Sequence, residues 1–178
     1  MLIVICPGVH PPDLTASFVQ ALDWPAEPLV LTERLPVYSP PHILTFLLQQ
    51  IPPSQRQTPI LLIGFSAGVV GTIGAAYLWQ ILGGRIMALI AIDGWGVPLF
   101  SPFPIHRISH DAFTHWSSAL LGAGQASFYA EPAVAHLELW RAPQTVCGWS
   151  VQSFAPRYHR ITAAQFLHDL LQHYQINA

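Results

Sequence analysis

The chain has 178 residues, of which 52% are hydrophobic and only 9% are charged, and this excludes a mainly disordered protein because there is ample apolar surface to bury. Its seven basic residues are all arginines, they form no run, and the formal net charge is −2, so we expect no nucleic-acid partner. Two cysteines, Cys6 and Cys147, are too few for a disulfide framework or a zinc ribbon. These features predict a single domain over residues 1–178 in a reducing, cytoplasmic compartment.

The stretch 57–84 contains no charged residue and is long enough to be considered as a membrane span. Several glycines interrupt it, and a β-type run precedes a helical pattern within it. A buried parallel strand followed by a helix packed on the sheet has the same apolar composition, so we do not expect membrane association. Residues 1–8 carry no positive charge, and their apolar run is too short for a signal peptide.

In chain order, short apolar runs that end at glycine, proline or polar residues predict strands at residues 2–5, 29–31, 60–63 and 86–92, and two further strands are expected at residues 105–109 and 127–130. Helical patterns between them predict helices at residues 13–22, 42–50, 67–82 and 113–121. A capping box at Thr162 and Gln165 begins a last amphipathic helix. The alternation predicts an α/β fold with a mostly parallel central sheet of about six strands and helices on both faces. Ligands bind such sheets at the carboxyl ends of the strands.

One motif at such a strand end points to chemistry. Gly64-Phe65-Ser66-Ala67-Gly68 matches G-x-S-x-G, and it stands between a predicted strand and a predicted helix. In a nucleophile elbow the serine occupies a sharp, strained turn, and small neighbours let strand and helix approach closely. The helix N-terminus favours the oxyanion that develops when the serine attacks. We therefore predict Ser66 as a nucleophile; the simpler interpretation is a glycine-rich turn with an idle serine.

With this motif the chain resembles the α/β-hydrolase family, and its size resembles the compact, lidless members of the retinoblastoma-binding serine hydrolase type. The resemblance covers most of residues 1–140. It implies a three-layer domain with a serine–acid–histidine triad in that chain order. It also implies an oxyanion hole formed by the backbone N–H groups of Val9 and Ala67. A plain member ends soon after its histidine, whereas this chain continues, so the role of residues 140–178 stays open.

The acid of the triad comes from few candidates. Asp93 and Asp111 each follow a predicted strand and would reach the active edge of the sheet, whereas Asp169 lies on the polar face of the last helix. Glu131 and Glu138 stand on the short segment that also holds a histidine. The family usually takes its acid from the strand two after the nucleophile strand, which favours Asp111. Asp93 is the alternative.

The base must be a histidine that follows the acid. The family places it a few residues after the sixth strand, which favours His136. His159, just ahead of the last helix, is the alternative, and His110, His115 or no triad at all also stay open. His168 and His173 face solvent on the last helix.

Other clusters are weaker. His106, His110, Asp111 and His115 are metal-ligand types, but prolines directly upstream exclude the helical pair of a metalloprotease, so we expect no metal and no cofactor. Cys6 ends the first strand and is interpreted as buried packing. Several aromatic residues either line an apolar pocket near the strand ends or belong to ordinary core and surface: Trp95, Phe100, Phe103, Trp116, Trp140 and Trp149.

The sequence thus predicts a serine hydrolase that cleaves a small-molecule ester or thioester with an apolar part. An acyltransferase would use the same residues. The rival hypotheses are a non-catalytic binding module on the same scaffold and a lipid hydrolase at a membrane surface. The substrate and the oligomeric state stay undetermined.

Overall fold

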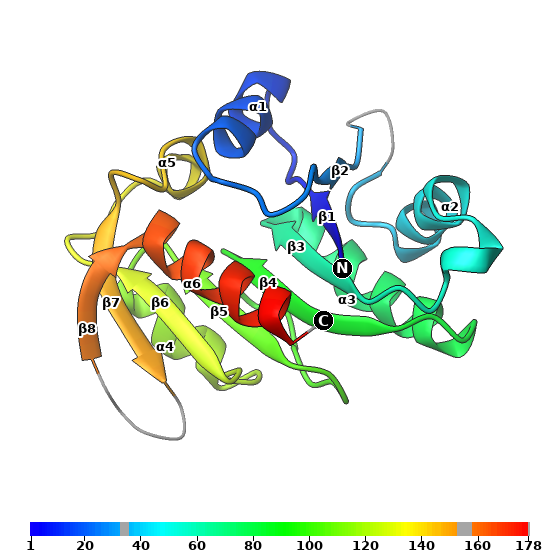
Figure 1. Cartoon of the computed structure of the whole chain (residues 1–178). Coiled ribbons are helices and arrows are strands. Elements are labelled where there is room, and N and C mark those ends of the chain that lie inside the picture. The colour runs from blue at the N-terminus through cyan, green and yellow to red at the C-terminus, as the bar shows by residue number, and fades with distance from the viewer. Residues whose placement is uncertain (33–35, 153–157, 178) are drawn as a thin grey trace.

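The computed structural model describes residues 1–32, 36–152 and 158–177 (Figure 1). Its centre is a single eight-stranded sheet in the order β2-β1-β3-β4-β5-β6-β7-β8. The strands are β1 (Leu2–Cys6), β2 (Leu29–Val30), β3 (Ile60–Phe65), β4 (Ile86–Ile92), β5 (Ile105–Ser109), β6 (Ala126–Ala130), β7 (Cys147–Gln152) and β8 (Tyr158–Thr162). The first six strands are parallel, and β7 and β8 are antiparallel. The predicted α/β class and mostly parallel sheet are confirmed.

The predicted strand number was too low, because the structure adds β7 and β8. Parallel strands are buried on both faces and stand out as continuous apolar runs, as β4 does with all seven residues buried. In contrast, β7 and β8 mix polar and apolar residues and form the antiparallel end of the sheet. The described residues of β7 and β8 are therefore part of the central sheet, since β7 pairs directly with β6 and β8 with β7.

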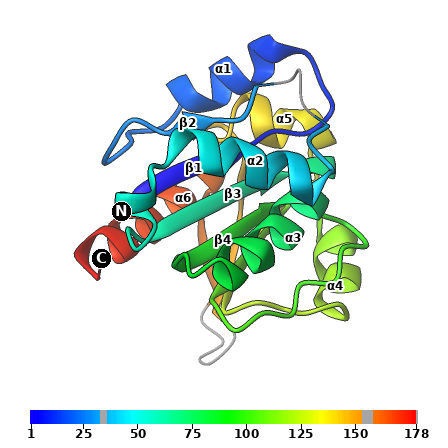
Figure 2. The same cartoon turned by 90° about the vertical axis from the view of Figure 1, so that its right-hand side faces the viewer.

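Helices cover both faces of the sheet (Figure 2). On one face lie α1 (Pro12–Gln20), α5 (His136–Arg141) and α6 (Ala163–Ile176), and on the other lie α2 (Pro40–Gln50), α3 (Ala67–Ile81) and α4 (Ala112–Ala119). A short 3₁₀-helix spans Pro53–Gln55. No helical pattern in the sequence predicted α5. The result is a three-layer arrangement.

The core is divided by the sheet into two clusters. Along β4 the side chains alternate, so that Ile90 packs in the cluster beneath α1, α5 and α6, while Leu89 packs in the cluster beneath α2 and α3. Each such fully buried aliphatic side chain contributes about 1.5–3 kcal/mol relative to exposure. β3 and β4 are buried along their whole length, and both strands end at the site described below.

The charge-free stretch forms β3 and α3, as predicted. In the described parts of the chain, none of the helices combines the length and the apolar composition that crossing a bilayer requires. Thr162 caps the last helix as predicted, since its side chain accepts the Gln165 N–H at 3.1 Å, but the Gln165 side chain donates to Asp169 at 2.7 Å and does not complete a capping box.

Candidate active site

Ser66 occupies a strained turn between β3 and α3. Its φ is 52° and its ψ is −123°, a backbone conformation that costs a non-glycine residue about 1–3 kcal/mol. Glycine is required by space at position 68, where a Cβ would lie 2.4 Å from the Pro7 carbonyl oxygen, and position 64 is tight, since a Cβ there would lie 3.1 Å from the Val69 Cα. The turn therefore has the strand–turn–helix geometry that a nucleophile elbow needs.

Asp93 is the second strained residue, with a φ of 51°. Among the described residues, Ser66 and Asp93 are the non-glycine residues with positive φ. They follow neighbouring strands, because Phe65 at the end of β3 is paired with Ile92 at the end of β4. Two strained residues thus stand side by side at the carboxyl edge of the sheet, where strain is a pointer to function.

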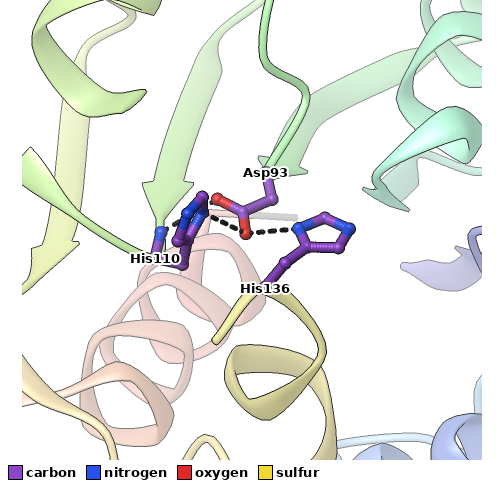
Figure 3. A group of neighbouring side chains, drawn as sticks. All are labelled: Asp93, His110 and His136. Atoms are coloured by element: carbon purple, nitrogen blue, oxygen red, sulfur yellow. Dashed lines mark hydrogen bonds and ion pairs between the residues drawn. The ribbon is translucent and has the colours of Figure 1, made fainter. Parts of the chain in front are cut away.

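The Asp93 carboxylate is buried, with 1% of its side chain exposed, and it accepts three hydrogen bonds. The His110 backbone N–H donates to Oδ1 at 2.9 Å, and His110 Nδ1 lies 2.9 Å from Oδ2. His136 Nδ1 lies 2.8 Å from the same Oδ2 (Figure 3). These contacts fix the carboxylate and orient both rings.

His136 is the first residue of α5, and an aromatic stack holds it beside the elbow. Its ring stacks on Phe65, the residue before Ser66, with centroids 4.8 Å apart and planes 17° apart. Trp140, one turn further along α5, stacks on Phe65 at 4.7 Å and on Phe18 at 3.7 Å. With Nδ1 bonded to Asp93, the second ring nitrogen, Nε2, is the one left for proton transfer.

Ser66, Asp93, His110 and His136 line one cavity of about 310 Å³. The rest of its wall is mostly apolar and consists of Ala67, Val70, Trp95, Val97 and Thr114. The cavity therefore combines a few convergent polar groups with an apolar lining, as small-molecule sites do.

Of the two residues predicted for the oxyanion hole, Ala67 directly follows Ser66, and Val9 follows Gly8, which lies beside Ser66. Ala67 is the first residue of α3, and first-turn amides have no partner within their own helix. The loop that carries Val9 passes directly beside the serine, since a Cβ on Gly8 would lie 3.0 Å from Ser66 Cβ.

The structure brings Asp93, the alternative acid, to His136, and it places Asp111 elsewhere. Asp111 caps α4, where its Oδ1 accepts the Thr114 N–H at 2.6 Å. An Asx-type cap directs a carboxylate at its own helix N-terminus, which is why Asp111 does not reach His136. Of the two histidines, His136 lies in the site, whereas the exposed His159 is on β8 at the far end of the sheet from β3.

Two residues of the site, His110 and Phe65, were not predicted as its main members. The His110-Asp111 pair directly after a strand was the available signal for His110, and the G-x-S-x-G pattern gives no information about Phe65, which occupies a variable position of it. The stacking role of Phe65 depends on α5, and α5 was not predicted.

The sequence cluster of histidines is divided between the two faces of the sheet. His106 Nε2 lies 2.7 Å from the Tyr174 hydroxyl on α6, while His115 stacks on Tyr129 at 4.8 Å on the α4 side. Burial lowers the pKa of His106 and of His115 to about 4. Both rings are therefore neutral packing residues at pH 7. Burial likewise raises the pKa of the Cys6 thiol to about 12, so Cys6 is not a second nucleophile.

Asp93, His110 and His136 are also the one group in the described residues whose ligand atoms are near enough to share a metal ion, within 4.8 Å of one another. Their closest contacts, 2.8 and 2.9 Å, are those of hydrogen bonds in which both Nδ1 atoms face one oxygen. We interpret the cluster as a hydrogen-bonded network.

No protein-family model matches the chain, and no curated protein is significantly similar to it. The function is therefore argued from the geometry of the site.

Proposed function

We propose that this protein is a serine hydrolase of the α/β-hydrolase type, which cleaves a carboxylic ester or thioester through Ser66, His136 and Asp93. One observation carries the proposal: strained Ser66 and strained Asp93 follow neighbouring strands, and they share one cavity with the histidine that Asp93 orients. The order serine, acid, histidine along the chain is that of the family which the sequence resembles.

In the proposed reaction, Ser66 Oγ attacks the carbonyl carbon while His136 Nε2 takes the hydroxyl proton. Asp93 holds His136 in the tautomer with hydrogen on Nδ1 and stabilises the imidazolium that forms. The N–H groups of Ala67 and Val9 stabilise the oxyanion. The C–O or C–S bond then breaks, His136 returns its proton to the leaving group, and water releases the acyl group from Ser66 by the same steps. The reaction needs no cofactor.

The lining of the cavity supports a substrate with an apolar part. Val70, Trp95 and Val97 form a wall beside the polar groups, and burial of each substrate methylene against it contributes about 0.8 kcal/mol. We also propose a cytoplasmic location, which is supported by the two free cysteines, buried Cys6 and exposed Cys147.

Hydrolysis of p-nitrophenyl esters of increasing acyl length tests the proposal. We expect turnover by the wild type and a loss of at least about a thousandfold in Ser66→Ala. Ser17→Ala, a half-buried serine on α1 that does not line the cavity, is the matched control and is expected to keep wild-type activity. A Ser66→Ala variant as active as the wild type would refute the proposed nucleophile.

A further inference from the structure

A second imidazole holds the Asp93 carboxylate. His110 directly follows β5, and its Nδ1 lies 2.9 Å from Asp93 Oδ2, the oxygen that also accepts from His136. Its backbone N–H donates to Oδ1. His110 therefore engages both oxygens of the carboxylate, and Figure 3 shows that carboxylate between the two rings.

Asp111 lies on the other side of His110. Its Oδ2 is 3.4 Å from His110 Nε2, so carboxylates and imidazoles alternate from Asp111 through His110 and Asp93 to His136. In the part of the chain that the structure describes, the titratable groups facing His110 are Asp93 at the end of β4, Asp111 at the start of α4, and His136 on α5. The His136 ring centroid is 5.9 Å from that of His110.

This arrangement favours a positive charge on His110. The hydrogen bond with Asp93 raises the pKa of His110 above its ordinary value, and the charges of Asp93 and Asp111 act in the same direction, while burial opposes them. A cation bonded to the oxygen that His136 shares disfavours a second positive charge on His136.

We propose that His110 is a positioning residue with two effects. It fixes the Asp93 carboxylate against His136, and its positive charge favours the deprotonated form of His136. The inference rests on the proposed function, in which His136 is the base. It gives His110 a role through Asp93, without contact to the reacting atoms. The consequence is that His136 is deprotonated, and able to activate Ser66, at a lower pH than it would be beside a neutral residue.

The pH dependence of fluorophosphonate labelling tests the inference. At low pH the labelling rate falls as His136 becomes protonated, and we call this fall the acid limb. His110→Asn keeps a side-chain hydrogen-bond donor but is neutral. We therefore expect the acid limb to move toward higher pH by about one unit. His42→Asn, an exposed histidine on α2, is the matched control and leaves the profile unchanged. A change in packing alone would lower the rate without moving the limb.

Asp111→Asn is the second variant. Asparagine is as good a helix N-cap as aspartate, so α4 keeps its cap, while one of the two anions that favour charged His110 is lost. We expect a smaller shift of the acid limb in the same direction. If His110→Asn fails to fold, Asp111→Asn alone tests the inference: a shift toward higher pH supports it, and no shift or a shift toward lower pH overturns it.

A titration of His136 followed by NMR gives a readout that needs no chemistry at Ser66. Release of the His136 proton at higher pH in His110→Asn than in the wild type supports the inference. An unchanged titration and an unchanged acid limb in both variants, or a shift toward lower pH, overturns it. If His136 titrates at higher pH in His110→Asn than in the wild type, but the fluorophosphonate never labels the wild type, the role of His110 is supported and the proposed hydrolase is refuted.

Discussion

Asp93 Oδ2 accepts a hydrogen bond from His136 Nδ1 at 2.8 Å, although the two residues are 43 positions apart in the chain. The contact joins the end of β4 to the start of α5, and both His136 and Asp93 line the cavity that Ser66 also lines. In the proposed reaction this bond determines which nitrogen accepts the serine proton.

The identity of the acid is tested by a matched pair of substitutions. Asp93→Asn leaves His136 without its anionic partner and is expected to lower the ester hydrolysis rate by about 10³- to 10⁴-fold. Asp111→Asn, which alters only the cap of α4 and the contact with His110, is expected to stay within about tenfold of the wild type at pH 8, because charge-assisted contacts of this kind contribute about 1.5 kcal/mol. Steady-state kinetics of ester hydrolysis by both variants test this expectation. Equal losses of rate in Asp93→Asn and Asp111→Asn would contradict Asp93 as the acid.

The identity of the base is tested in the same way. His136→Ala removes the group that takes the Ser66 proton, and the labelling rate is expected to fall by about 10²- to 10⁴-fold. His159→Ala changes an exposed residue on β8 and is expected to leave the rate unchanged. Wild-type labelling by His136→Ala would exclude it as the base.

The elbow tolerates no side chain at Gly68. A methyl group there would lie 2.4 Å from the Pro7 carbonyl oxygen, so Gly68→Ala must displace the loop that carries Val9. We expect a loss of about 1–3 kcal/mol in the free energy of unfolding together with a loss of labelling. Gly83→Ala is the control: its φ of 82° makes it strained, but a Cβ there meets nothing within 4 Å, so stability falls and labelling persists. Urea denaturation and labelling of both variants test this, and full labelling of Gly68→Ala would count against a tight elbow.

Stability should decrease in mild acid because of the two buried histidines. Burial lowers the pKa of His106 and of His115 from 6.5 to about 4, so between these pH values each ring is protonated only in the unfolded chain. The contribution of these neutral rings to the free energy of unfolding is fully present above pH 6.5. As the pH is lowered below 6.5, it decreases by about 1.4 kcal/mol per pH unit for each histidine. Urea denaturation at a series of pH values between 6.5 and 4 measures the slope of the unfolding free energy against pH. His106→Gln should halve that slope. A slope equal to that of the wild type would contradict the role given to His106.

Much of the fold followed from local pattern. β1, β3 and β4 are almost uninterrupted apolar runs, and β4 over Ile86–Ile92 has the predicted bounds, whereas β5 carries His106 and Arg107 within it. The antiparallel strands lacked that signal, and α5 has only six residues, too few for a clear helical period. Ser66 followed from a motif with a physical reason for each position. The sequence could not distinguish Asp93 from Asp111, because both residues follow strands. Two features of the structure distinguish them: the backbone of Asp93, with its φ of 51°, and the tertiary position of α5.

The most direct test of the account is a covalent one. The wild type and Ser66→Ala are incubated with a fluorophosphonate, and the modified residue is located by mass spectrometry of the peptides. We predict a single phosphonyl adduct on Ser66 and none in Ser66→Ala. A well-folded wild type that forms no adduct, or an adduct on another residue, would contradict the proposed serine hydrolase.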